Sequence, residues 1–188
     1  MSRKPSRQAQ RTRRLLQEAL ISLVQEREFN TLRIQDITDR ADLGRATFYM
    51  HYSDKEDLLG AIVDQSYEEI QKRLETLGDP KGFIGLKWAL EYASEQPELF
   101  RVVLQQQRAI DRIRSFIVGQ ITEELNRINH AADLPSGANT KATAHIISGA
   151  ILGTFYWWLD HQGELSPEEV KNLFNQILLE GIPQSKLL

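Results

Sequence analysis

Helical spacing of apolar residues runs through this 188-residue chain almost from end to end, and it limits the possible fold more than any other feature. Apolar side chains recur three or four positions apart, as at Leu16, Leu20 and Leu23, and again along residues 110–128. This spacing gives each segment one apolar face, as in helices that pack on a core. The sequence therefore predicts an all-α fold of about nine helices, with no convincing strand.

The breaks in this pattern predict two modules. A first helix is expected over about residues 12–25, two short helices within residues 33–52, and a long helix from about residue 54. Gly78-Asp79-Pro80 ends the long helix and is the expected module boundary, because Gly and Pro interrupt helices. We expect a basic N-terminal arm over residues 1–8, a three-helix domain over residues 9–70 and a C-terminal helical bundle over residues 78–188.

Two capping boxes mark helix starts. Ser53 is expected at the N-cap of the long helix with Glu56 three residues later, and Ser166 and Glu169 form the same pair around Pro167. In such a box the Ser hydroxyl and the Glu carboxylate each accept a backbone N–H at the helix start. Pro167 then occupies the first helical position, where its missing N–H costs nothing.

The formal net charge of -3 hides an asymmetry. Residues 1–14 hold six basic residues and no acidic one, whereas residues 61–188 hold 12 basic and 17 acidic residues. A basic N-terminal segment is typical of chains that contact phosphate, although a solvated tail has the same composition. The charge pattern therefore allows a nucleic-acid partner at the N-terminal end.

Several classes of function lack their characteristic residues. The chain has no cysteine, which excludes disulfides and thiolate sites and fits a reducing compartment. The four histidines, at positions 51, 130, 145 and 161, have no histidine partner at helical spacing, so no metal site is expected. No nucleophile elbow, phosphate loop or dinucleotide fingerprint is present. We therefore expect neither an enzyme nor a bound cofactor.

The segment 33–52 has the layout of a helix-turn-helix. Ile34, Ile37 and Phe48 supply apolar positions that would pack a pair of short helices against the first helix. The outer face of the second short helix is left with side chains that can donate hydrogen bonds to phosphates or base edges, namely Arg45, Thr47, Tyr49 and His51. By pattern alone, an ordinary helical hairpin with a polar exposed face remains an alternative.

The run from Ala41 to Leu59, ADLGRATFYMHYSDKEDLL, closely resembles the TetR/AcrR family of bacterial transcriptional regulators. The resemblance covers about residues 9–70 and implies a DNA-binding domain there. It implies that Arg45, Ala46 and Thr47 face the major groove, with Arg45 reading a guanine. It also implies phosphate contacts from Tyr49, His51 and Lys55.

One position departs from the family pattern. Many members have Thr at the start of the second helix, where this chain has Arg33. Arg33 can still donate to a phosphate, but a guanidinium cannot accept a backbone N–H as a cap. Thr31 is expected to take over the cap.

The C-terminal module contains an uncharged run of 18 residues from Ala142 to Leu159. Its length is close to that of a membrane span, but Thr, Ser, His and Gly within it favour a buried helix of a soluble bundle. The resemblance implies an effector-binding and dimerisation domain here, with close helix approach at Gly149-x-x-x-Gly153. The expected dimer-interface residues are Gly149, Ala150, Gly153, Phe174, Ile177 and Leu178. The expected effector-pocket residues are Trp88, Tyr92, Phe100, Phe116, His145, Tyr156 and Trp157.

These features predict a homodimeric, cytoplasmic bacterial regulator that acts on nucleoid DNA. We expect it to repress from a palindromic operator and to be released by an apolar or amphipathic small molecule. The alternatives are a helical interaction or scaffold protein that does not bind DNA, and a membrane-associated protein that uses residues 142–159.

Overall fold

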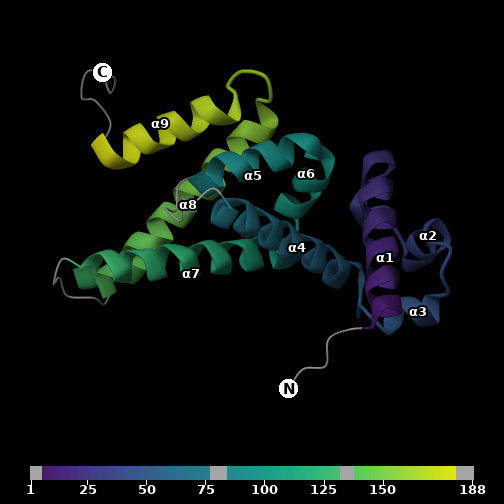
Figure 1. The fold of residues 1–188 in the computed structure, drawn as a ribbon. Coiled ribbons are helices and arrows are strands. Elements are labelled where there is room, and N and C mark those ends of the chain that lie inside the picture. Colours follow the sequence, from purple (N-terminus) through teal and green to yellow (C-terminus); the bar gives the residue numbers. More distant parts are fainter. Residues whose placement is uncertain (1–5, 77–83, 132–137, 181–188) are drawn as a thin grey trace. The chain divides into compact units, whose positions relative to one another are not determined.

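The computed structural model describes residues 6–76, 84–131 and 138–180, and these residues form nine α-helices and one turn of 3-10 helix, η1 (Figure 1). The predicted all-α fold is therefore confirmed. In chain order the elements are α1 (Arg7–Glu26), η1 (Phe29–Thr31), α2 (Ile34–Arg40), α3 (Arg45–Tyr49), α4 (Lys55–Thr76), α5 (Ile84–Glu95), α6 (Pro97–Gln105), α7 (Gln107–Ala131), α8 (Ala138–Asp160) and α9 (Pro167–Glu180).

The chain divides into two compact units. Unit 1 comprises Met1–Ser66 and Glu98–Ile110, and unit 2 comprises Tyr67–Pro97 and Asp111–Leu188. The helices α4 and α7 each contribute residues to both units. The expected boundary at Gly78-Asp79-Pro80 lies outside the described residues. Most of α6 and the first turn of α7 belong to unit 1, which the sequence pattern did not indicate.

Unit 1 is built around α1, which packs on α2, while α2 packs on α3 (Figure 1). Leu16, Leu20, Ile37 and Phe48 are fully buried and form the centre of its core. The first helix is longer than the predicted 12–25, because the Ser6 hydroxyl caps it by accepting the Ala9 N–H at 3.2 Å. The basic residues of positions 7–14 thus lie on a helix rather than on an arm.

Hydrogen bonds and ion pairs between side chains link α2 to α1. The Arg40 guanidinium donates two hydrogen bonds to the Glu26 carboxylate, at 3.0 and 2.7 Å, and a third to the Ser22 hydroxyl at 2.5 Å. Arg27 pairs with Asp36 at 3.2 Å. A two-point Arg–carboxylate pair fixes direction as well as distance, so these contacts set the angle at which α2 leaves α1.

The start of α4 differs by one residue from the prediction. Asp54, not Ser53, is the N-cap, because its Oδ1 accepts the Asp57 N–H at 2.6 Å. The Asp57 carboxylate in turn accepts the Ser53 N–H at 3.0 Å and the Ser53 hydroxyl at 3.3 Å. The predicted pairing of Ser53 with Glu56 is therefore wrong. An aspartate at the next position offers a stronger acceptor for the same orphan N–H groups.

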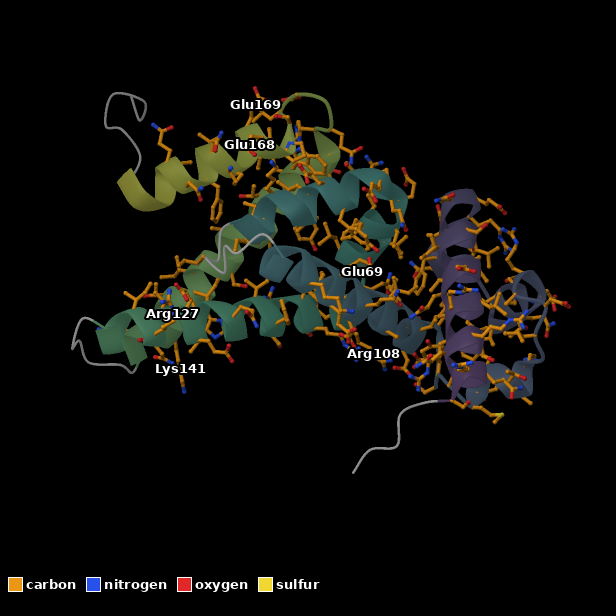
Figure 2. The ribbon with its side chains drawn as sticks, in the orientation of Figure 1. Glu69, Arg108, Arg127, Lys141, Glu168 and Glu169 are labelled. Carbon is orange, nitrogen blue, oxygen red and sulfur yellow. The ribbon has the colours of Figure 1, made fainter. Side chains whose placement is uncertain are left out.

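In unit 2, α5 packs on α9. Lys87 of α5 pairs with Glu168 of α9 at 2.8 Å. The second capping box is confirmed, since Glu169 Oε2 accepts the Ser166 N–H at 2.8 Å and Ser166 Oγ accepts the Glu169 N–H at 3.3 Å. Figure 2 shows Glu168 and Glu169 together at the first turn of α9, as expected for acidic residues at a helix N-terminus.

The uncharged helix α8 has two faces. One is buried in unit 2 and includes Ala144, Ser148, Leu152 and Phe155. The other is exposed, with Ile146 71 % exposed. Among the described residues, no helix is long and apolar enough to cross a membrane.

Candidate nucleic-acid interface

The turn between α2 and α3 is held by the backbone. Asp42 has a φ of 54°, in the left-handed region that Asp tolerates better than most residues. The chain reversal that follows lets the Leu43 N–H donate to the Thr38 carbonyl at 2.9 Å. Gly44, in extended conformation, then leads into α3. The two short helices are thus joined as in a helix-turn-helix.

Helix α3 is anchored by a single large side chain. Phe48 is 0 % exposed, and its ring meets Tyr49 edge-on at a centroid distance of 5.6 Å and Tyr52 at 5.9 Å. Because Phe48 alone is buried on this five-residue helix, the other positions are held in place without packing inward. Arg45 and Ala46 are exposed, and Thr47 is half-buried.

Tyr49 and Met50 extend the exposed face at the end of α3, and they are 52 % and 79 % exposed. Met50 was not singled out from the sequence. The sequence alone does not show whether a methionine is exposed, because the packing of its neighbours decides whether it is buried.

Arg33 is exposed at the start of α2, and its backbone N–H donates to Asp36 Oδ2 at 2.7 Å. This contact holds the pKa of Asp36 below its ordinary value. The predicted cap by Thr31 is wrong, because the Thr31 hydroxyl donates to the Glu28 carbonyl at 2.8 Å instead. The Arg33 guanidinium has no ion-pair partner within residues 6–76, 84–131 and 138–180.

His51 is half-buried beside Tyr52. Burial, and then the positive charge of Arg13, lower the pKa of His51, which favours the neutral imidazole. It can therefore donate one N–H to a phosphate without carrying charge. The Tyr52 hydroxyl is buried and has no hydrogen-bond partner among the described residues.

Arg13 was not among the predicted site residues. It lies three and seven residues before Leu16 and Leu20, so it shares their face of α1, and its charge acts on both His51 and Tyr52. Arg7, Arg11 and Arg14 lie on the opposite face. The sequence alone could have identified Arg13, because its spacing from the leucines places it on the apolar face of the helix.

Lys55 is placed differently from the other predicted phosphate contacts. Its ammonium donates to the backbone carbonyls of Phe29, Asn30 and Leu32, at 2.8, 3.2 and 2.9 Å. The N-terminus of α4 is likewise occupied, by the carboxylates of Asp54 and Asp57. An anion at this helix start would meet carboxylates rather than free N–H groups.

The predicted effector-pocket residues are distributed over both units. Phe100 belongs to unit 1, whereas Tyr92 and Phe116 are half-buried in unit 2, where Phe116 packs on Tyr67 at a centroid distance of 4.1 Å. The remaining described members are exposed on α8 and do not line the interior: His145, Tyr156 and Trp157. The side chain of Trp88 lies outside the described part of the structure.

Most of the predicted dimer-interface residues are exposed. Gly149, Ala150 and Gly153 lie on the open face of α8, and Ile177 is 42 % exposed on α9. Phe174 differs, because it is buried within unit 2. Leu178 has a side chain outside the described part. Among the described residues there is no cluster of three or more His, Asp or Glu side chains that could hold a metal ion.

The fold and the open face of α3 define this chain as a helix-turn-helix protein. Residues 16–62 match the family model described as "Bacterial regulatory proteins, tetR family". Over residues 16–62 the chain is therefore similar to the regulators of this family.

Known proteins are similar to this chain over more residues than the matched segment. The "Uncharacterized HTH-type transcriptional regulator YxbF" of Bacillus subtilis (strain 168) is 28 % identical over 172 residues, which cover 87 % of this chain and 43 % of that protein. The chain therefore spans less than half the length of this relative.

Solved structures share the fold. A TetR transcriptional regulator from Streptococcus agalactiae 2603V has a TM-score of 0.68 at 22 % identity, covering 92 % of this chain and 96 % of that one. The transcriptional regulator FadR from Bacillus subtilis, in complex with stearoyl-CoA, has a TM-score of 0.66 at 16 % identity, covering 90 % and 99 %. At these identities the likeness concerns the fold alone.

Proposed function

We propose that this protein is a transcriptional repressor that binds a palindromic operator as a homodimer and is released by a small-molecule effector. The main observation in support of DNA binding is the exposed face of α3. Arg45, Ala46 and Tyr49 are exposed there, while the helix is held by the buried Phe48 behind them. A short helix fixed from one side and open on the other is what entry into a major groove requires.

The charges around α3 support the same proposal. Arg13, Arg33 and Arg45 come from three different helices or their caps and make no ion pair within the described part of the chain. Cations that make no ion pair are available for phosphates, and neutralising phosphates releases counterions from DNA. His51 and Tyr49 add neutral donors at the same end of the domain.

The exposed face of α8 and α9 supports a homodimer. Ile146, Tyr156 and Trp157 of α8 and Leu173 and Ile177 of α9 are at least 40 % exposed, which is unusual for large apolar side chains on two consecutive helices. No charged residue occurs from Ala142 to Leu159, and the small residues at 149, 150 and 153 leave room for a second helix. A second copy presents the same surface and is the occupant we propose. We therefore assign Tyr156 and Trp157 to this face instead of the pocket.

An effector site within unit 2 is supported by an unsatisfied polar group. The Ser148 hydroxyl is fully buried and has no hydrogen-bond partner among the described residues. A buried hydroxyl without a partner costs free energy that a ligand could recover. Stearoyl-CoA in the FadR structure supports a ligand of amphipathic character. Ser148, rather than the exposed His145, is therefore the polar residue of α8 to test.

Selection of bound duplexes from a random pool by the full-length protein tests the function. We expect a palindromic consensus, because two copies of α3 read two half-sites. Arg45→Ala is expected to relax the preference at one base pair of each half-site, by about 1–3 kcal/mol. Arg127→Ala, an exposed arginine of unit 2 paired with Glu124, is the control and is expected to leave the preference unchanged.

Two outcomes would contradict the proposal. No enrichment from the pool, even at low salt, would favour a helical interaction protein that does not bind DNA. An enriched sequence whose preference survives Arg45→Ala would show that α3 is not the reading element.

A further inference from the structure

The ammonium of Lys55 uses all its hydrogen-bond donors within unit 1. It lies in the first turn of α4, yet it donates to three carbonyls of the connection between α1 and α2, those of Phe29, Asn30 and Leu32. A lysine ammonium has three N–H donors. All three are therefore used, and none is left for a further acceptor.

The ring of Phe29 also contacts the Lys55 ammonium. Lys55 Nζ lies 4.7 Å from the centroid of this ring, within the range of a cation–π contact. Phe29 is 3 % exposed, and Leu32 is equally buried. The positive charge thus lies between a buried ring and backbone carbonyls in and directly after a short 3-10 turn, of which the Phe29 carbonyl also accepts the Leu32 N–H at 3.1 Å.

The connection whose carbonyls accept hydrogen bonds from Lys55 leads directly into α2. Leu32 supplies the last of the three carbonyls, and Arg33, the next residue, is the N-cap of α2. Because α2 packs on α3, a shift of this connection would be passed to the face that carries Arg45. Lys55 thus joins the start of α4 to the entry of α2 across more than 20 residues of sequence.

We propose that Lys55 is a positioning residue that fixes α2 and α3 for reading DNA and that it makes no ion pair with a DNA phosphate. This inference rests on the proposed function. A phosphate could bind the ammonium only by displacing carbonyls that already hold it. The cations with no ion-pair partner in the described part, such as Arg13 and Arg33, supply the phosphate contacts instead.

The first test needs no DNA. Amide hydrogen exchange is compared between the wild type and Lys55→Met, which keeps the apolar stem and removes the donors. We expect at least tenfold faster exchange for the Leu32 and Ile37 amides, which lie in the connection and in α2, with little change in α8 and α9. Equal exchange rates in the two proteins would overturn the proposal, whether or not the chain binds DNA.

The second test measures binding to the selected operator and to a random duplex over a range of salt concentrations, at a temperature where every variant is folded. For Lys55→Met we expect the ratio of operator to random affinity to fall at least tenfold, while the slope of log K against log salt stays unchanged. Arg33→Met is the matched control, since it removes an exposed cation and is expected to reduce the slope by about one.

Lys55→Arg separates the two roles most sharply. A guanidinium serves a phosphate as well as an ammonium does, but its planar fork does not match three carbonyls that converge on one point. We therefore expect Lys55→Arg to lose discrimination as Lys55→Met does. Wild-type discrimination in Lys55→Arg, or a slope reduced by one with unchanged discrimination in Lys55→Met, would overturn the proposal. Loss of sequence preference in the wild type itself would contradict the proposed function and leave the exchange test to decide the role of Lys55.

Discussion

Replacing Gly153 with alanine gives opposite results for an isolated chain and for a dimer that uses α8. An alanine Cβ built at Gly153 would have no heavy atom within 4 Å in the chain. In an isolated chain, Gly153→Ala would therefore stabilise α8 by about 1 kcal/mol, the difference in helix propensity between the two residues.

In a dimer the same Cβ would lie between two closely approaching helices. The added volume would cost about 1–3 kcal/mol, which corresponds to a roughly 5- to 150-fold weaker dimer. Sedimentation equilibrium measures the dissociation constant directly, and chemical unfolding of dilute protein measures the gain in the single chain.

Gly119→Ala is the matched control. Gly119 lies on an exposed position of α7, and a Cβ there likewise meets nothing within 4 Å. We expect the same gain in helix stability with no change in dimerisation. Equal dissociation constants for Gly153→Ala and Gly119→Ala would refute the assignment of the α8 face to the dimer interface.

Three further predictions concern stability. Asp42→Gly is expected to leave the melting temperature unchanged or raise it, whereas Asp42→Val should cost about 1–2 kcal/mol, because a φ of 54° disfavours β-branched residues; equal melting temperatures would contradict this. Tyr52→Phe should be neutral or stabilising in denaturant unfolding, since the buried hydroxyl has no hydrogen-bond partner among the described residues, and a loss above about 1 kcal/mol would indicate a missed partner. Hydrogen bonds from Lys171 and then Lys87 lower the pKa of Glu168 to about 2, so the stability they provide is present above pH 4.5, the ordinary pKa, and is lost as the pH falls towards 2. Lys87→Met should therefore lower the melting temperature at pH 7 more than at pH 3, and an equal difference at both pH values would contradict the pairing.

The helices were predictable because their apolar spacing is local information. Residues 16–23 and 110–128 repeat at helical spacing, and both segments are helical in the structure. The capping box at Ser166 was found for the same reason, since its partners lie three residues apart. Where two acceptors compete, as Ser53 and Asp54 do, the sequence allowed either start, and only the packed structure selects one.

The role of Lys55 and the faces of α8 could not be predicted in this way. The carbonyl partners of Lys55 lie more than 20 residues away, and backbone carbonyls carry no residue-specific signal. Helix α8 has no charge from residue 142 to 159, so its sequence does not distinguish a buried face from an exposed one. His145, Tyr156 and Trp157 could thus be taken for pocket residues, although they are exposed.

The single buried anchor of α3 has an evolutionary consequence. Phe48 alone among its five residues is buried, so the exposed positions 45 and 46 can be exchanged with little effect on folding. Drift in the preferred DNA sequence is then nearly free of any folding penalty, and a duplicated copy of the gene could acquire a new set of targets through a few substitutions in this helix.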